Sequence, residues 1–379
     1  MPQALKSSLG MVGGLTLAAA LSIAGTPSRS QAPGVLDAEV GQLNKPHASE
    51  TVGIRNGSFV VAPIPFSNPT IGSGLILGAG YLFQLDKGSD PSVIGAAVLR
   101  SDNGSQAAGA ALNLYLHDNR WIIKTLFARA DVQYDLYTGA SILPIRQDGV
   151  LGQIGVSYGV TPDLSFGPSF RYLDTTITPA FAGLPPIPPP FDQFLEVEIL
   201  NVGLVADWDT RDDTIYPTRG HALHVSASRG IALSGLVQDY NKGYVNYSRY
   251  VPLSDRSMIA ARASVCAASA EAPFFDQCGL GTTDGFRGFS ATQFLDLRAA
   301  SLQLEYRHRF TKRLGGVAFG GVGQVGPEFD ELDAGGTHSA YGIGARYRVS
   351  KKFPLDFSVD VSRNSEQDNT LYIYVGQRF

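Results

Sequence analysis

The stretch Lys124-Thr-Leu-Phe-Ala-Arg-Ala-Asp-Val-Gln-Tyr-Asp-Leu-Tyr137 alternates between apolar and polar side chains. A period of two residues places alternate side chains on opposite faces of a β-strand. The apolar face holds Leu126, Ala128, Ala130, Val132, Tyr134 and Leu136, and the polar face holds Arg129, Asp131, Gln133 and Asp135. The stretch therefore predicts a strand with one apolar and one polar face.

The same two-faced pattern recurs in Tyr341–Val349 and Phe353–Ser362. These segments are longer than the roughly 5–6 residues that are typical of strands in soluble sheets. A tilted strand that crosses a membrane needs about 9–11 residues. Their length favours transmembrane strands, with the apolar face toward lipid, over strands of a soluble sandwich with one wet face.

The composition agrees with a chain built from such strands. Of 379 residues, 44% are apolar and 17% charged, and there are 43 Gly, 20 Phe and 16 Tyr. A normal apolar fraction and a net charge of −4 exclude disorder over most of the length. An isoelectric point near 5.9 without a basic cluster argues against a nucleic-acid partner. Only the N-terminal end approaches the apolar run of about 18 residues that a membrane helix needs.

A transmembrane antiparallel β-barrel reconciles an apolar composition with the scarcity of membrane helices, because a closed barrel pairs every backbone group. We expect one all-β domain of about 16 strands, an even number as in bacterial barrels. The expected strands cover about residues 52–63, 72–85, 93–101, 105–116, 120–137, 149–160, 164–176, 196–209, 220–230, 238–252, 256–268, 294–310, 314–325, 339–350, 354–363 and 370–379.

Short and long connections between these segments alternate. The long ones are 177–195, 269–293 and 326–338, and the short ones fall on the opposite side. Outer-membrane barrels combine short periplasmic turns with longer outer loops. Both termini are therefore expected in the periplasm, and 269–293 is expected to be the sixth outer loop.

Residues 1–32 are interpreted as a secretory signal peptide. Lys6 supplies the positive charge and Leu9–Gly25 the apolar core, with small residues after it. The cleavage site stays open because Pro33 is a poor first mature residue, and a single membrane anchor is the alternative. We expect 33–51 to be a short periplasmic segment and 52–379 a barrel in the outer membrane of a Gram-negative-type bacterium.

Export to an oxidising compartment also bears on the two cysteines. Cys266 and Cys278 are 12 residues apart and are candidates for a disulfide, with two free thiols as the alternative. The end of the chain carries another barrel signature: Ile373, Val375 and the terminal Phe379 lie on the apolar face of the last expected strand. An ordinary edge strand that ends in Phe is the alternative for this second feature.

Two motifs go beyond barrel geometry. Asp209–Gly220 reads DTRDDTIYPTRG and occupies an expected periplasmic turn, and Gly281–Phe289 reads GTTDGFRGF in the expected sixth loop. A polar turn closed by Pro217 and Gly220 is enough to explain the first motif. A flexible Gly-rich loop does not explain an arginine between aromatic residues in the second.

Together the motifs resemble the bacterial surface antigen family, which includes the central barrels of the barrel assembly machinery and of the translocation and assembly module. The family has an Arg-Gly-aromatic tripeptide on its sixth outer loop. The loop motif is matched by Asp284, Arg287, Gly288 and Phe289, and the turn motif by Asp209, Arg211, Asp212, Pro217, Thr218 and Gly220. The resemblance covers about residues 195–379, and before that it rests on strand pattern only.

The resemblance implies that the loop folds into the lumen and that its arginine meets acidic side chains there. Alternation places Glu305 on the lumen face, so it is the expected partner of Arg287. The family's second acid lies in an F-x-D-x-G motif on the next strand, where this chain has Phe319–Gly323 with Gly321 in place of the Asp. Half of the acidic clamp is therefore expected to be missing.

The resemblance implies a role in assembly, insertion or translocation of outer-membrane proteins. The partners would be outer-membrane lipid and unfolded client proteins or a separate periplasmic protein, and the barrel itself would be monomeric. In relatives the first and last strands pair weakly, and Gly57 and Gly376 are candidates to weaken that seam here. Relatives carry periplasmic POTRA repeats, and the roughly 20 residues between Ala32 and the first expected strand are too few for one.

A passive porin-like or structural surface barrel without insertase activity is the alternative function. An enzyme is not expected, because the six His residues are scattered and there is no G-x-S-x-G element. His221 and His224 lie on opposite faces of one expected strand, which argues against a shared metal. We expect no cofactor, no metal and no nucleotide site.

Overall fold

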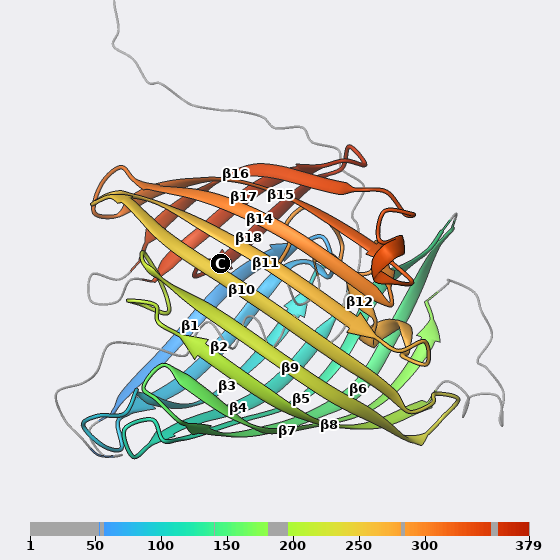
Figure 1. The fold of residues 1–379 in the computed structure, drawn as a ribbon, viewed down its shortest axis with the longest axis horizontal. Helices are drawn as coiled ribbons and strands as arrows, with labels where there is room; N and C mark the ends of the chain where they lie inside the picture. Colours follow the sequence, from blue (N-terminus) through green and yellow to red (C-terminus); the bar gives the residue numbers. More distant parts are fainter. Residues whose placement is uncertain are drawn as a thin grey trace, which may run out of the picture.

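The computed structural model describes residues 53, 57–139, 141–180, 196–281, 285–349 and 355–378. They form one closed antiparallel barrel of 16 strands in which each strand pairs with its neighbours along the chain (Figure 1). A separate two-stranded sheet, β12–β13, lies in the loop between β11 and β14. The expected fold class and strand number are confirmed.

The barrel strands are β1 (Ser58–Asn68), β2 (Gly72–Phe83), β3 (Ser92–Ser101), β4 (Gln106–Leu116), β5 (Trp121–Thr138), β6 (Ser141–Gly159), β7 (Leu164–Pro179), β8 (Glu196–Asp209), β9 (Gly220–Ser234), β10 (Tyr240–Ser254), β11 (Ser257–Ala268), β14 (Arg298–Arg309), β15 (Leu314–Gly326), β16 (His338–Arg348), β17 (Asp356–Asn364) and β18 (Asn369–Val375). The small sheet is β12 (Cys278–Gly279) and β13 (Leu295–Asp296), and η3 (Phe274–Asp276) and η4 (Phe329–Glu331) are 3-10 turns. In the described part of the chain, no helix is long and apolar enough to cross a membrane.

The largest differences from the expected strand positions occur in two strands. The first strand begins at Ser58 rather than at residue 52, and β6 begins at Ser141 rather than at 149. Both strands contain proline, which lacks an N–H donor and is usually found near strand ends or on edge strands. Pro63 and Pro65 lie inside β1, and Pro144 lies inside β6. The proposed signal peptide and the segment before the barrel lie outside the described residues.

Large apolar side chains point outward around the barrel. Exposed examples from seven strands are Leu77, Val98, Phe127, Phe166, Leu204, Leu304 and Ile343. Aromatic residues flank this apolar belt near the end with the β4–β5 and β6–β7 hairpins, where the Trp121 and Tyr158 ring centroids are 5.3 Å apart. We call this the turn end, and the opposite end, which carries β12 (on the right in Figure 1), the loop end.

The upper part of β5, toward the loop end, reverses the expected orientation. Ala128, Val132 and Tyr134 are buried inside the barrel, whereas the side chain of Arg129 on the other face is 72% exposed. The apolar side chains pack against Phe274 and Phe275 of the loop that enters the lumen, near residues of β6 and β7. Leu126, further down the same face, also packs inside with Ala128, whereas Phe127 on the other face is exposed. The prediction that the apolar face of 124–137 points toward lipid is therefore wrong, because the loop supplies an apolar partner inside.

Candidate functional site

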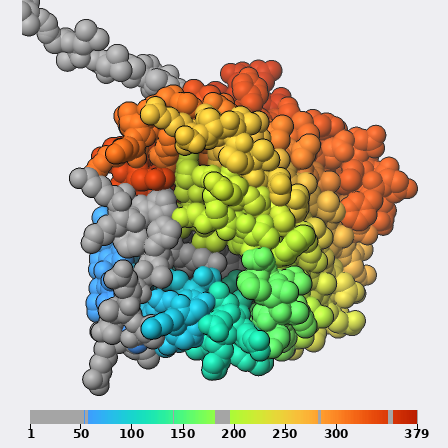
Figure 2. All heavy atoms as spheres, turned by 60° about the vertical axis from the view of Figure 1, so that its left-hand side comes forward, coloured from blue at the N-terminus to red at the C-terminus, as the bar shows by residue number. Residues whose placement is uncertain are grey.

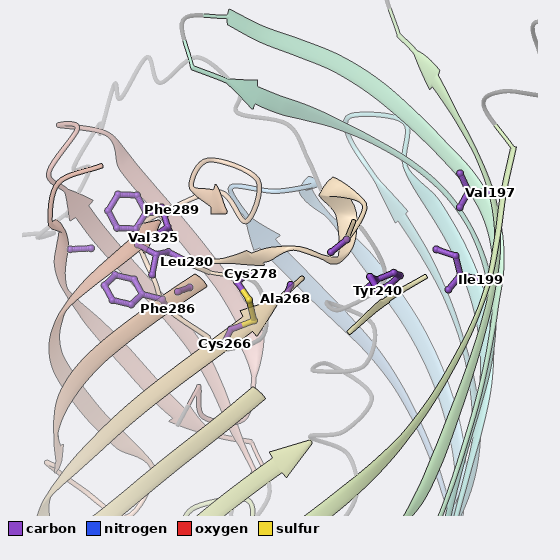
Figure 3. Close-up of a cluster of buried hydrophobic side chains, with 13 residues drawn as sticks. Val197, Ile199, Tyr240, Cys266, Ala268, Cys278, Leu280, Phe286, Phe289 and Val325 are labelled. Carbon is purple, nitrogen blue, oxygen red and sulfur yellow. A yellow bond between two sulfur atoms is a disulfide. The ribbon is translucent and has the colours of Figure 1, made fainter. Parts of the chain in front are cut away.

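The loop between β11 and β14, residues 269–297, enters the barrel from the loop end; we call it loop 6. A disulfide joins Cys266 at the end of β11 to Cys278 in the loop, with their Cα atoms 5.6 Å apart (Figure 3). Beyond it, Leu280, Phe286 and Phe289 belong to one buried apolar cluster that also includes wall residues of β15 and β16. The loop is thus attached covalently at its root and by apolar packing further along, as the sticks in Figure 3 show. Asp284 of the predicted motif lies outside the described residues.

Arg287 occupies the centre of the packed wall and is 2% exposed. Its guanidinium donates from Nη2 to Glu305 and from Nη1 to Asp360 Oδ2 at 2.6 Å. Its Cζ atom lies 3.5 Å from the centre of the Phe319 ring. Burial disfavours the charge, but the two carboxylates outweigh it and raise the pKa of Arg287 above its usual range.

The second carboxylate comes from β17 rather than from β15, so the expectation of a half-missing clamp is wrong. Gly321 on β15 has no room for a side chain, because a Cβ there would lie 2.9 Å from Gln303 Cγ and 3.0 Å from the Phe286 ring. Phe286 of loop 6 lies in the place that a larger residue would occupy. Asp360 faces the lumen two strands further on and completes the clamp.

The two acids also bind arginines of the wall. Glu305 Oε1 accepts from Arg307 Nε at 2.5 Å, and Asp360 accepts two bonds from Arg346. The Tyr374 hydroxyl on β18 donates to Asp360 Oδ2 at 2.7 Å and accepts from Arg346 Nη2 at 2.9 Å. The network therefore runs from loop 6 through β14, β16 and β17 to the last strand of the barrel.

Gly288 shows why the motif needs glycine after the arginine. Its φ is +121°, and a Cβ would lie 2.4 Å from the Cβ of Ala340. Its N–H donates to the Tyr372 hydroxyl at 2.7 Å, and its carbonyl accepts from Asn364 Nδ2 at 2.8 Å. The loop backbone is thus bound directly to side chains of β17 and β18, while Phe289 packs in the apolar cluster.

A second charged contact holds loop 6 to the opposite wall. Asp276 in η3 is buried, accepts from Lys242 Nζ at 2.9 Å and also binds Arg171 and Tyr240. Burial opposes ionisation of this carboxyl group, but the charges of Arg171 and Lys242 outweigh it and lower the pKa of Asp276 to about 2. The sequence does not single out Asp276, because a single acid after two Phe residues carries no motif and its partners lie on other strands.

The turn motif Asp209–Gly220 lies at the turn end and binds mainly its own backbone. Asp212 Oδ1 accepts from the amides of Thr218 at 2.8 Å and Arg219 at 3.1 Å. Arg211 Nη2 lies 2.7 Å from Asp209 Oδ2. These contacts define the shape of the turn.

The turn ends at Pro217 and Gly220, and Gly220 has a φ of +99°. Immediately before Pro217, Tyr216 reaches the charged wall: its ring centre lies 4.4 Å from Arg309 Cζ and 5.0 Å from Arg348 Cζ. Both arginines bind Asp356 at the turn end of β17. The turn motif is therefore joined to the same wall as loop 6, a relation that its sequence does not reveal.

The other side of the lumen is open. A cavity of about 1030 Å³ is lined mainly by residues of β4 to β11, both polar and apolar, and Figure 2 shows a hollow between the cyan and green strands and the yellow-green ones. His224 Nδ1 lies 2.7 Å from Asp207 Oδ1 on this wall, and Lys124 Nζ lies 3.9 Å from Asp207 Oδ2. No group of three or more potential metal ligands occurs in the described ranges. Nothing in the described lining forms a catalytic arrangement that we can assign.

The seam between the first and last strands is short. β1 pairs with β2 along its whole length, but among the described residues it pairs with β18 at Ser67 and Ile373 alone. β18 ends at Val375, and Gly376 follows with a φ of +100°. Ile373 alternates with the buried Tyr372 and Tyr374 and lies on the outward face of β18, while Phe379 lies outside the described residues. The edge of β1 below Ser67 therefore lacks a described partner from β18.

Gly57 lies immediately before β1, at the start of this edge, and a Cβ there would lie 2.2 Å from the carbonyl oxygen of Leu82 on β2. Further along β1, Pro63 and Pro65 contribute no N–H donor to either neighbour. Pairing with β2 nevertheless continues through both prolines. Proline is tolerated in this way on edge-like strands, which agrees with the short β1–β18 pairing.

Comparisons with known proteins agree with this geometry. Residues 193–379 match the Omp85 superfamily domain, which confirms the resemblance drawn from the loop and turn motifs. No curated protein matches the sequence of the chain. The matched part begins just before β8 and contains loop 6, the turn motif and β18.

Solved structures share the fold at low identity. BamA from Haemophilus ducreyi lacking POTRA domains 1-3 is 13% identical, with 85% of this chain and 70% of that chain covered and a TM-score of 0.58. CdiB from Acinetobacter baumannii is 10% identical (84% and 59% covered, TM-score 0.56), and CdiB from Escherichia coli is 13% identical (85% and 68% covered, TM-score 0.53). The chain therefore carries an Omp85 superfamily domain over residues 193–379, within a barrel that has the fold of these proteins.

Proposed function

We propose that this chain is an outer-membrane barrel that assists the insertion or translocation of other outer-membrane proteins, in a non-catalytic role. The outward apolar belt suits a lipid environment, and the Omp85 domain supports this location. The short connections at the turn end and the long loop 6 at the other end support an orientation with both termini in the periplasm. Unfolded client proteins, delivered directly or by a separate periplasmic partner, are the proposed substrates.

The observation that carries the proposal is the short seam between β1 and β18. A strand edge without a full partner can accept an incoming strand by β-augmentation. Phe59 on this part of β1 is 82% exposed, so an incoming strand would also meet an apolar side chain there. The seam therefore offers a client strand both backbone hydrogen bonds and apolar contact.

A disulfide across the seam tests this proposal. Ser67→Cys with Ile373→Cys joins β1 to β18, because residues directly opposite in an antiparallel pair have the Cα separation that a disulfide needs. The matched control, Leu77→Cys with Val98→Cys, joins β2 to β3 in the same way. Liposomes with the wild-type protein or the oxidised control should insert a model barrel faster than empty liposomes.

The oxidised seam variant should lose that acceleration and regain it on reduction, while the control is insensitive to both treatments. Full activity with a cross-linked seam would contradict the proposed route. No acceleration by the wild-type protein would contradict the insertase function itself.

The open side of the lumen favours the second candidate, a passive pore. The cavity of about 1030 Å³ is bordered by Phe286 and Phe289 of loop 6, so the packed loop leaves this part of the lumen unfilled. Single-channel recordings separate the two candidates. A steady open conductance without insertase activity would favour the pore, whereas insertion without such a conductance favours the insertase.

A further inference from the structure

A charged side chain points outward from the barrel wall near the turn end. Arg249 on β10 is exposed and lies directly opposite His221 of β9 and Ala261 of β11. Its outward neighbours along β10 are Tyr247 and Val251, which are both exposed apolar side chains. The guanidinium therefore stands on the face of the wall that carries the apolar belt.

The charge is isolated on this part of the wall. On the described outward faces of β8 to β11, the other charged side chains, Glu196, Glu198 and Arg229, lie toward the loop end. Arg229 has a carboxylate partner, Asp239, at 3.0 Å. A charged group on a lipid-facing surface is costly unless it meets a counter-charge or the interface. Arg249 thus needs an explanation that Arg229 does not.

Aromatic residues hold the Arg249 side chain in place. Arg249 Nη1 lies 3.2 Å from His221 Nδ1, and since arginine can only donate, that ring nitrogen is the acceptor. The His221 ring lies edge-on to Trp208, with centroids 4.2 Å apart, and 6.0 Å from the Tyr247 ring. This contact uses one of the N–H donors of the guanidinium group, and the group carries further donors that a ligand can use.

We propose that Arg249, with His221, Trp208 and Tyr247, binds the phosphate of an anionic glycerophospholipid. A guanidinium fork matches the geometry of phosphate oxygens, and Trp and Tyr favour the level of the lipid headgroups. Ala261 on the adjacent strand leaves space beside the guanidinium. In the proposed orientation the site faces the periplasmic leaflet. The inference rests on the membrane location given under the proposed function but not on insertase activity.

Native mass spectrometry of the full-length protein in detergent tests the site with phosphatidylglycerol, and with phosphatidylcholine as the zwitterionic comparison. Arg249→Ala should lower the apparent affinity for phosphatidylglycerol about fivefold, the effect of one basic residue near an anionic surface. Arg229→Ala, which removes an outward arginine at the other end, should leave the affinity unchanged. Arg249→Lys should fall between wild type and Arg249→Ala, because it keeps the charge and loses the fork.

Equal phosphatidylglycerol binding by wild type and Arg249→Ala would overturn the site. Displacement of the lipid by inorganic phosphate would also overturn the lipid assignment, because it would indicate a simple anion site. Arg249→Gln, with a gel assay of folding, replaces the alanine variant if that variant does not fold. If Arg249→Ala loses lipid binding but keeps insertion, the result supports the lipid site and leaves the insertase function unaffected. If the wild type binds lipid but does not insert a model barrel, only the proposed insertase function is contradicted.

Discussion

The wall formed by β14 to β18 is closed by loop 6, whereas the wall formed by β4 to β10 faces an open cavity. On the closed wall, Arg287, Glu305 and Asp360 are almost fully buried and bind one another. On the open wall, the side chains of Lys124, Asp207 and His224 are partly exposed to the lumen. The difference indicates that the loop motif packs and holds one side of the barrel.

The closed wall is also the one that contains β18, the strand with short pairing to β1. On β18, Tyr372 accepts a hydrogen bond from the Gly288 amide of loop 6. Tyr374 donates to Asp360, the acid that also binds Arg287 of loop 6. A strand with few backbone partners on one edge is thus held from the inside by side chains. Loop 6 therefore takes over part of the stabilisation that a longer β1–β18 ladder would supply.

The largest expected effect comes from Arg287→Ala. Removing one partner from a buried charge network leaves carboxylates uncompensated and costs about 3–5 kcal/mol. The folded fraction seen as the heat-modifiable band on a gel should fall strongly. Arg129→Ala, on the exposed outer face of β5, is the control and should change stability by less than about 0.5 kcal/mol. Equal effects of the two substitutions would remove the distinction between a buried and an exposed arginine.

Asp276 tests the contact of loop 6 with the opposite wall. Its pKa is lowered to about 2, so the ionised carboxyl group stabilises the fold above about pH 4 and loses this effect as the pH falls toward 2. Asp276→Asn should cost about 2–3 kcal/mol at neutral pH. Proteolysis of loop 6 should increase in the variant at pH 7, and in the wild type only below about pH 4. The contact would be dispensable if two results were found together: proteolysis of loop 6 in the wild type does not depend on pH, and Asp276→Asn is cleaved no faster than the wild type.

Gly288→Ala isolates the close approach of loop 6 to β16. The left-handed φ and the short distance to Ala340 should together cost about 1–3 kcal/mol. Gly336→Ala is the matched control, because Gly336 also has a positive φ but an added Cβ there would have no atom within 4 Å. In thermal unfolding, the melting temperature of Gly288→Ala should be well below that of Gly336→Ala. The same melting temperature for both would mean that backbone strain, and not packing against β16, explains the glycine.

The smallest effect is expected on the outer face of β5 and β6. Arg146 Nη2 lies 2.6 Å from Asp131 Oδ2, but the Arg146 side chain is 53% exposed. Exposed pairs contribute about 0–1 kcal/mol, so Arg146→Ala should leave the melting temperature nearly unchanged. A loss as large as that of Arg287→Ala would show that the outer charged surface is structural, contrary to the contrast drawn between the two walls.

Local alternation was enough to predict the number of strands, most of their positions and the lumen-facing acid Glu305. Glu305 follows from the pattern of β14, and Asp360 lies on the polar face of Phe353–Ser362 for the same reason. What the pattern could not supply is that Asp360 meets an arginine 73 residues earlier in the chain. Such a pairing depends on barrel closure and on the path of loop 6, which are properties of the whole fold.

The reversed face of upper β5 has a similar cause. Alternation predicts two faces but not which one points inward, and that choice depends on what lies on each side. Phe274 and Phe275 of loop 6 provide an apolar surface inside the barrel at this level. Tyr134, 1% exposed, therefore points into the lumen, where its hydroxyl donates to Gln147 Oε1 at 2.7 Å.

Hydrogen–deuterium exchange of β18 in the wild type and in Arg287→Ala is the most direct test that loop 6 holds the seam strand. Exchange should become faster over residues 369–378, while residues 121–127 on the open wall keep their wild-type rates. Unchanged exchange in β18, or an equal increase on both walls, would contradict the account.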